Sequence, residues 1–304
     1  MNINGITIDD TFAEAFNMRA TRVVITGLNL KWAYHAANAM TGFATSVIGC
    51  GVEADIEREL NADETPDGRL GVSVLMFATG SKVLMQQLET RMGQCILTCP
   101  SVAAFAGIEH REGLEIDQIN LGAHLRYFGD GFQTSKLIAA KRYWRIPVMD
   151  GEFLVQESTG MVRAIGGGNF LILATSQESA LNASETAIEV MKKVPNVIMP
   201  FPGGVVRSGS KVGSKYPNMF ASTNDAFCPT LKGLTKTELD DDIESVLEIV
   251  IDGLTFDDVA KAMKVGIEAI CALGVASGVQ RISAGNYGGK LGPHHFKLHE
   301  VLKK

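Results

Sequence analysis

Two glycine-rich segments contain the residue types that bind a large polar substrate. Residues 200–215 read PFPGGVVRSGSKVGSK, and residues 282–292 read ISAGNYGGKLG. Glycine lets the backbone approach a ligand closely or adopt a positive φ. Lysine, arginine and hydroxyl side chains donate hydrogen bonds to anionic or carbonyl oxygens. Two such loops in one part of the chain predict a site for a large polar substrate.

Polar side chains in and beside these loops are the candidate substrate contacts. Residues 221–230 are a dense cluster of short polar side chains that follows the first loop. An ordinary turn has the same composition, and the pattern leaves that alternative open. The candidate substrate-binding residues are Arg207, Ser210, Lys211, Lys215, Ser222, Thr223, Asn224, Asp225, Ser283, Asn286 and Lys290.

Glu248 is the candidate for proton transfer. It lies within a run, residues 247–251, that otherwise reads as a buried strand. A carboxylate in such a place is costly unless it is paired, hydrogen-bonded or protonated. Burial would raise its pKa toward neutrality, where a general acid or base works best. A glutamate on an edge strand, facing water, is the alternative that the pattern leaves open.

Motifs for nucleotides and metals are incomplete. The phosphate-binding motif G-x-x-x-x-G-K-[ST] fails in both loops, because Ser210 precedes Lys211 and because Leu291 replaces the hydroxyl residue. The dinucleotide motif G-x-G-x-x-G and the nucleophile motif G-x-S-x-G do not occur. The histidines lack cysteine or carboxylate partners at ligand spacing, so we expect no metal site. A serine or cysteine nucleophile assembled from distant residues stays open.

The elements that must position these residues form one repeated unit: a strand, an apolar-faced helix and another strand. The first and last strands of the four units are predicted at 22–26 and 44–48, 71–78 and 95–99, 170–174 and 197–200, and 247–251 and 280–284. The apolar stripes comprise Trp32, Ala33, Ala36, Ala37 and Met40; Leu84, Met85, Leu88 and Met92; Ala180, Ala183, Ala187, Ile188, Met191 and Val194; and Val259, Ala262, Met263, Gly266, Ile270 and Leu273. Thr255 and Asp258 resemble a capping box for the fourth helix.

Taken in pairs, the four units give the order βαββαβ twice. We therefore predict an α+β protein with two duplicated ferredoxin-like lobes, residues 1–149 and residues 150–304, the second of which carries most of the glycine, serine and lysine loops. Irregular inserts at matching places, 52–70 and 202–244, favour duplication over a single doubly wound sheet. The Asp150-Gly151 pair after the β-rich run 143–149 predicts a tight hairpin where the lobes join.

The amino-acid composition indicates which broad class of protein this chain belongs to. The 304 residues are 46% apolar and 20% charged, as in folded globular proteins, and the net charge of −6 argues against nucleic acid as the main partner. The N-terminus lacks the pattern of a signal peptide, and no apolar run approaches the ~20 residues of a membrane span. The five cysteines indicate reduced thiols. We therefore expect a cytoplasmic protein.

The chain resembles formylmethanofuran–tetrahydromethanopterin formyltransferases. The resemblance spans the whole chain in order and rests on many short motifs. These are DTFAEAF at 10–16, TGFATSVI at 41–48, ETPDGR at 64–69, GQC at 93–95, FGDG at 128–131, GGNF at 167–170, PFPGG at 200–204, SKVGSK at 210–215, ASTND at 221–225, EIVI at 248–251 and ISAGNYGGKLG at 282–292. The amino-acid sequence from residue 144 onward, and that of residues 208–210, is similar to the bacterial, methylotroph-type branch of this family.

The resemblance implies an acyltransferase that moves a formyl group between the nitrogen of methanofuran and N5 of tetrahydromethanopterin. It also implies two ferredoxin-like lobes, no prosthetic group and Glu248 as the acid/base residue. The partners implied are the two carrier coenzymes, further copies of the chain in a homo-oligomer (a tetramer in archaea), and the other subunits of a formyltransferase/hydrolase complex used in formaldehyde oxidation, where it resembles the transferase subunit. A scaffold subunit and a carrier that binds furan or pterin without chemistry are the alternatives.

Overall fold

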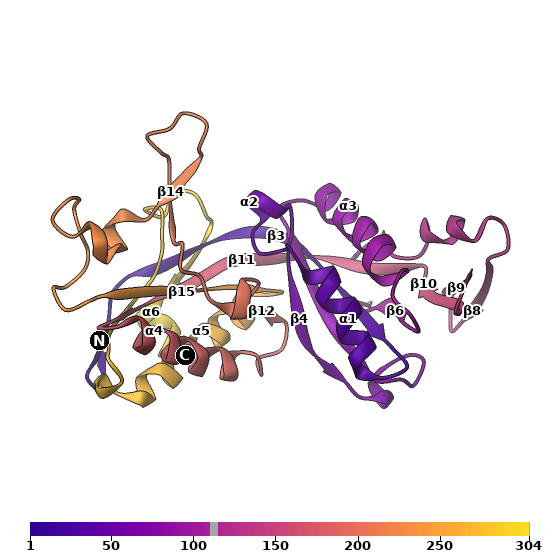
Figure 1. Ribbon diagram of the computed structural model, residues 1–304, viewed down its shortest axis with the longest axis horizontal. Coiled ribbons are helices and arrows are strands. Elements are labelled where there is room, and N and C mark those ends of the chain that lie inside the picture. The colour runs from indigo at the N-terminus through magenta and orange to yellow at the C-terminus, as the bar shows by residue number, and fades with distance from the viewer. Residues whose placement is uncertain (110–114, 304) are drawn as a thin grey trace. The chain divides into compact units, whose positions relative to one another are not determined.

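A computed structural model describes residues 1–109 and 115–303, which divide into two compact units (Figure 1). Unit 1 comprises Met1–Asn17 and Ile165–Lys304, and unit 2 comprises Met18–Ala164. Both boundaries fall inside long strands, β3 (Phe12–Thr26) and β11 (Ser158–Ala174). The division by packing thus differs from the predicted boundary between residues 149 and 150, because the apolar residues of the N-terminal segment belong to the core of unit 1.

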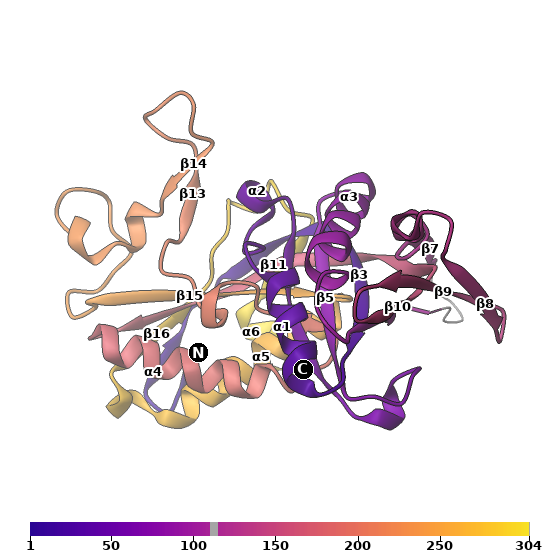
Figure 2. The same cartoon turned by 45° about the vertical axis from the view of Figure 1, so that its right-hand side comes forward.

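Unit 1 holds a sheet with helices packed on one face. Its remaining strands are β1 (Asn2–Ile3), β2 (Ile6–Ile8), β12 (Val197–Ile198), β15 (Ser245–Gly253), β16 (Val279–Ser283) and β17 (His294–Lys297). Its helices are α4 (Gln177–Met191), α5 (Phe256–Leu273) and α6 (Leu298–Val301). The order β12-β15-β11-β16 is antiparallel throughout, and β2 pairs in parallel with β16. Helices α4 and α5 lie side by side beneath β15 in both views (Figures 1 and 2).

The two long helices of unit 1 form where the apolar period predicts them. Ser176 caps α4 and Thr255 caps α5, each accepting a hydrogen bond from a backbone N–H of the first turn. The predicted stripes face the core except for Leu273, which is 42% exposed in the last turn of α5. The predicted capping box at the start of α5 is confirmed in one half: the Asp258 N–H donates to Thr255 Oγ1 at 3.1 Å, and the Asp258 carboxylate accepts from the Thr255 hydroxyl at 2.7 Å.

A separate two-stranded hairpin extends away from the sheet of unit 1 (Figures 1 and 2). It pairs β13 (Ser210–Val212) with β14 (Ala221–Thr223) in antiparallel register. Short 3₁₀ turns flank it at Pro202–Gly204, Asp225–Phe227 and Pro229–Leu231. The segment that the sequence predicted to be irregular thus holds a small ordered hairpin, which carries several of the predicted site residues.

Unit 2 repeats the strand order of unit 1. Its remaining strands are β4 (Glu53–Leu60), β5 (Gly71–Ala78), β6 (Ala103–Ala106), β7 (Asp117–Asn120), β8 (Thr134–Ile138), β9 (Lys141–Val148) and β10 (Gly151–Gln156). Its helical segments are α1 (Leu30–Thr41), α2 (Val47–Cys50), α3 (Ser81–Arg91) and a short π-helix, η2 (Met92–Ile96). The order β4-β5-β3-β6 is antiparallel, and the hairpin β9–β10 joins it through parallel pairing of β10 with β6.

Two predicted strands of unit 2 are wrong. Residues 44–48 lead into α2, where Ser46 accepts a hydrogen bond from the second N–H of the helix. The real strand, β4, lies within the predicted insert, and its alternation is obscured by charged residues such as Glu57, which pairs with Arg22 at 2.7 Å. Residues 95–99 continue the helical turn after α3, and the strand that follows, β6, is alanine-rich and therefore gives a weak β signal.

Other predictions for unit 2 hold. Strand β5 has the predicted bounds, and its eight residues are all buried. The Asp150-Gly151 hairpin joins β9 to β10, with Val148 paired to Gly151, whose φ of +130° suits glycine. Met85 is an exception: it is 41% exposed on α3, so it does not belong to that helix's buried face.

Candidate functional site

Glu248 lies in the middle of β15, opposite Leu171 of β11. Successive side chains of a strand point to opposite faces of the sheet. Ile249 and Ile251 pack into the core of unit 1 with the apolar residues of α4 and α5, so Glu248 points to the other face. This is the face from which the hairpin β13–β14 departs, and the strand therefore presents one carboxyl group to the predicted substrate loops.

The first glycine-rich loop runs directly beside Glu248. Val206 and Glu248 exchange two backbone hydrogen bonds, of 2.7 and 2.9 Å, which fix the loop against β15. Three residues later, Gly209 passes so close that a Cβ placed on it would lie 3.4 Å from Glu248 Oε2. The backbone N–H of Asn224 donates to the carbonyl of Gly209 at 2.9 Å, which ties the polar cluster after the hairpin to the same place.

The Glu248 carboxyl is partly buried and has no hydrogen-bond or ion-pair partner among the described residues. Loss of hydration on burial raises its pKa from 4.5 to about 7. A carboxyl group with this pKa both holds and releases a proton near neutral pH. Such a group without a counter-charge is typical of acid–base sites.

A small pocket of about 40 Å³ opens at Glu248. Three other predicted residues, Arg207, Thr223 and Asn224, line it together with Glu248. The apolar part of the wall consists of Leu171, Val206, Phe227, Val246 and Leu247. The structure thus brings three of the predicted substrate-binding residues together around the predicted acid/base residue.

The hairpin residues mostly contact one another. Lys211 Nζ lies 2.5 Å from Asp225 Oδ1, and this hydrogen bond holds the pKa of Asp225 below its usual range. Ser222 donates to the carbonyl of Gly213 at 2.7 Å, across the hairpin. Lys211, Ser222 and Asp225 therefore stabilise the hairpin itself, and their side chains are already engaged.

Three predicted cations extend into solvent. Arg207, Lys215 and Lys290 are exposed, and no carboxylate in the described ranges pairs with them. Ser210, which begins β13, is also exposed. Cations without partners are free to meet the anionic groups of a ligand.

The second glycine-rich loop is organised around Glu14, which sequence analysis did not select. Glu14 is almost fully buried on β3, and its carboxylate accepts four backbone hydrogen bonds. The donors are the N–H groups of Tyr287 and Gly289, both at 2.8 Å, and those of Leu291 and Gly292, at 2.5 and 2.6 Å. Burial by itself raises the pKa of Glu14, but the four hydrogen bonds outweigh it and the pKa lies below its ordinary value.

Two further residues predicted in this loop, Asn286 and Ser283, lie within the protein. Asn286 donates to the carbonyl of Phe12 at 3.2 Å and accepts from the N–H of Gly288 at 3.1 Å. Ser283 is buried at the end of β16. The amides of the loop therefore bind a carboxylate of the same chain, and the loop is a fixed support beside the site.

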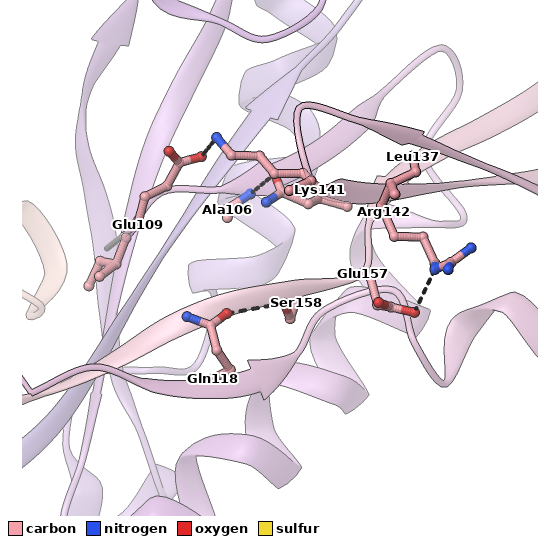
Figure 3. Close-up of a pocket in the computed structure, with 11 residues that line it drawn as sticks. Ala106, Glu109, Gln118, Leu137, Lys141, Arg142, Glu157 and Ser158 are labelled. Atoms are coloured by element: carbon pink, nitrogen blue, oxygen red, sulfur yellow. Dashed lines mark hydrogen bonds and ion pairs between the residues drawn. The ribbon is translucent and has the colours of Figure 1, made fainter. Parts of the chain in front are cut away.

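A second, larger cavity of about 390 Å³ lies in unit 2 (Figure 3). Its polar wall residues pair with one another: Lys141 with Glu109, Arg142 with Glu157 at 3.6 Å, and Ser158 with Gln118 at 3.1 Å. None of the predicted site residues lines it. Its charges cancel in pairs, in contrast to the unpaired carboxyl group at Glu248.

Two kinds of feature are missing across residues 1–109 and 115–303. No three histidine, cysteine, aspartate or glutamate side chains gather closely enough to hold a metal ion. No helix there combines the length and the apolar character that crossing a bilayer requires.

Comparison with known proteins gives a consistent result over the whole chain. The profile of the formylmethanofuran-tetrahydromethanopterin formyltransferase family matches residues 1–148, and the profile of the family's proximal lobe matches residues 151–301. A formylmethanofuran–tetrahydromethanopterin formyltransferase of Methylobacillus flagellatus is 72% identical over 99% of this chain and 100% of its own length.

Relatives from a multisubunit enzyme are also similar. One subunit of the formyltransferase/hydrolase complex of Methylorubrum extorquens is 51% identical over 99% of this chain and 97% of its own. A chain in the crystal structure of that complex, which contains methylofuran, superimposes with a TM-score of 0.96 at 51% identity, covering 100% of this chain and 99% of that one. The chain described here belongs to the formylmethanofuran–tetrahydromethanopterin formyltransferase family.

Proposed function

We propose that this protein transfers a formyl group between the amide nitrogen of methanofuran and N5 of tetrahydromethanopterin. Family membership supports the reaction, and the observation that carries the assignment of the site is Glu248. Its carboxyl group is partly buried, lacks a partner among the described residues and has a pKa of about 7. It stands beside Arg207, Thr223 and Asn224 at the foot of the glycine-rich loop.

The chemistry is direct attack of an amine on a formamide. The N5 lone pair of the pterin attacks the formyl carbon, and the carbonyl π electrons move to oxygen, giving a tetrahedral oxyanion. When the oxyanion collapses, the bond from carbon to the methanofuran nitrogen breaks. Holding the reacting atoms about 3–3.5 Å apart contributes roughly 7–11 kcal/mol to lowering the barrier, so no covalent enzyme intermediate is required.

Glu248 carries the proton in this scheme. Its carboxylate accepts the proton that N5 loses on attack, and the resulting acid donates it to the departing methanofuran amine. The residue thus ends the cycle in its starting state. A pKa near 7 suits both transfers, because neither protonation state is strongly favoured at neutral pH.

The predicted residues that line the pocket at Glu248, together with the exposed polar residues of the two loops, are our candidates for substrate binding. Arg207, Lys215 and Lys290 would meet the carboxylates of the substrate tails. Ser210, Thr223 and Asn224 would contact pterin edges or the carbonyl oxygen. The remaining predicted residues, Lys211, Ser222, Asp225, Ser283 and Asn286, would hold the loops that carry these contacts. Both carriers are substrates, and the protein needs no prosthetic group in this scheme.

We further propose that the chain is a duplication of a ferredoxin-like lobe, with a sequence boundary near residues 149 and 150. The support is the common strand order, β12-β15-β11-β16 in unit 1 and β4-β5-β3-β6 in unit 2. In each unit, helical segments connect the first strand along the chain to the second, and the third to the fourth. This is the split β-α-β arrangement.

Assembly and location follow by analogy with the relatives. We propose that the protein works in the cytoplasm as a homo-oligomer, a tetramer as in archaea, or with the hydrolase subunits of a larger complex. The support is its 51% identity to a subunit of the formyltransferase/hydrolase complex. A scaffold or a carrier without chemistry remains the competing reading.

The test is a spectrophotometric assay of the purified protein with formyl-tetrahydromethanopterin and methanofuran. We expect transfer by the wild type alone and a fall in kcat of at least about 100-fold in Glu248→Gln. Glu244→Gln, a change at an exposed glutamate just before β15, is the matched control and should keep the wild-type rate. Absence of transfer by the wild type would support the scaffold or the carrier, and normal turnover of Glu248→Gln would remove its acid/base role.

A further inference from the structure

Tyr287, in the second glycine-rich loop, carries a phenol close enough to the Glu248 carboxylate for that charge to raise its pKa. A side-chain hydrogen bond from Ser210, the residue that follows Gly209 along the first loop, acts to lower the pKa of the phenol. Gly209 itself adjoins Glu248 Oε2. The aromatic ring lies with its centroid 6.2 Å from that of Phe16 on β3, and the side chain is 37% exposed. The phenol is therefore held on one side and open to a ligand on the other.

The backbone at Tyr287 is held in place by a hydrogen bond to the Glu14 carboxylate. The Tyr287 N–H is one of the four that donate to the buried Glu14 carboxylate, at 2.8 Å. After it, the chain turns through Gly288 and Gly289 at φ of +76° and +71°, a conformation that glycine adopts without strain. This turn brings the N–H of Gly289 to the same carboxylate oxygen. The backbone that carries the phenol is thus held by hydrogen bonds that do not involve substrate.

The surroundings of Tyr287 keep its phenol protonated. Burial is the main factor that raises its pKa, and the carboxylate of Glu248 on β15 raises it further; the Ser210 hydrogen bond lowers it by less than Glu248 raises it, and Glu14 on β3 adds the smallest increase. A phenol in this setting is a hydrogen-bond donor over the whole physiological range. It does not compete with Glu248 for the transferred proton.

The reaction needs such a donor at a second atom. Negative charge develops on the formyl oxygen, whereas Glu248 exchanges its proton with the two nitrogens. We propose that the Tyr287 hydroxyl donates a hydrogen bond to the oxyanion and that Glu14 is the positioning residue that holds it there. This inference rests on the proposed function. The phenol keeps its proton throughout, so no further group has to supply or remove one.

Tyr287→Phe tests the inference while keeping the ring and its contact with Phe16. Loss of one oxyanion donor typically lowers kcat by about 100- to 1,000-fold. We expect a loss in this range with KM changed less than about twofold, since the contact forms in the transition state. Tyr127→Phe, which removes an exposed phenol in unit 2, is the matched control. The assignment would be overturned by an unchanged kcat, including the case in which only KM rises.

Dependence on pH separates the two roles. In Tyr287→Phe the residual rate should still titrate with the group near pH 7, because Glu248 is retained. In Glu248→Gln that titration should disappear. If the wild type is active and Glu248→Gln is not, while Tyr287→Phe has a normal kcat, only this inference fails. If Glu248→Gln turns over normally, the proposed function of the site fails instead.

A double-variant cycle tests the positioning role of Glu14. Glu14→Gln should lower kcat toward that of Tyr287→Phe, and the two changes together should cost little more than Tyr287→Phe alone, since both act on one hydrogen bond. Losses that multiply would show that Glu14 acts independently of the phenol, and the positioning role would be wrong. If Glu14→Gln does not fold, Tyr287→Phe with its control decides the role of the phenol.

Discussion

Replacing Glu248 by glutamine should change how the stability of the fold depends on pH. The folded pKa of Glu248 is about 7, against 4.5 for an ordinary glutamate. Between these values the folded state binds more protons than the unfolded state, so the free energy of unfolding falls as pH rises from 4.5 through 7. Below pH 4.5 Glu248 is protonated in both the folded and the unfolded state, and it no longer lowers the free energy of unfolding.

The size of this effect follows from the shift. One pKa unit corresponds to 1.36 kcal/mol, so a rise from 4.5 to about 7 gives a cost of about 3 kcal/mol that is complete above pH 7. Partial access of solvent to the carboxyl group makes this an upper limit. Glutamine carries no charge at any pH, so Glu248→Gln should be more stable than the wild type at pH 8.5 by as much as about 3 kcal/mol and similar to it at pH 4.5.

The assay is denaturant unfolding of both proteins at several pH values between 4.5 and 8.5. The difference between them isolates the residue, because all other titrating groups are common to both. Glu244→Gln, at an exposed position, should show no such pH-dependent difference from the wild type. A difference between the wild type and Glu248→Gln that stays constant from pH 4.5 to 8.5 would refute the assigned burial and pKa of Glu248.

Two further predictions concern the packing that supports the site. Glu14→Gln replaces one carboxylate oxygen by an NH₂ group that faces two backbone N–H donors, and leaving two buried donors unsatisfied should cost about 2–6 kcal/mol in the free energy of unfolding, measured from denaturant midpoints. An unchanged midpoint would contradict the four-donor arrangement. Gly266→Ala on α5 places a Cβ 2.5 Å from Met191 Sδ and 3.2 Å from the Phe170 ring, and should cost about 1–3 kcal/mol, whereas Gly49→Ala, with open space around it, should cost far less.

The sequence predicted the elements whose apolar pattern is regular. The stripes of α4 and α5 are long and periodic, so their burial could be predicted almost residue by residue. Strand β4 was missed because it carries charged residues, several of them satisfied by partners far along the chain, such as Arg22 for Glu57. Such pairs are visible only once the strands are aligned, and a charged strand read alone is indistinguishable from a loop.

The candidate site was predictable in part. Glu248 was identified because a lone carboxyl group interrupts an apolar strand, and the structure places it beside the predicted loop. Glu14 gives the same signal between Ala13 and Ala15, yet it was not selected. Its donors come from residues 287–292, and no local pattern states that the amides of a distant loop converge on it. Sequence therefore located the polar loops but did not show which of their groups are already bonded within the protein.

Unit 1 is built from two separate stretches of sequence, and this affects the order in which a newly made chain can fold. Residues 18–164 leave the ribosome as one continuous stretch, so unit 2 is able to bury its core during translation. The first seventeen residues must wait for the last part of the chain, because the bond between Glu14 and Gly292 spans 278 positions. A chain that stops before residue 292 lacks part of the amide cluster and exposes a carboxylate meant for the interior. Acquisition of a complete site is thus tied to completion of synthesis, and truncated products are left without it.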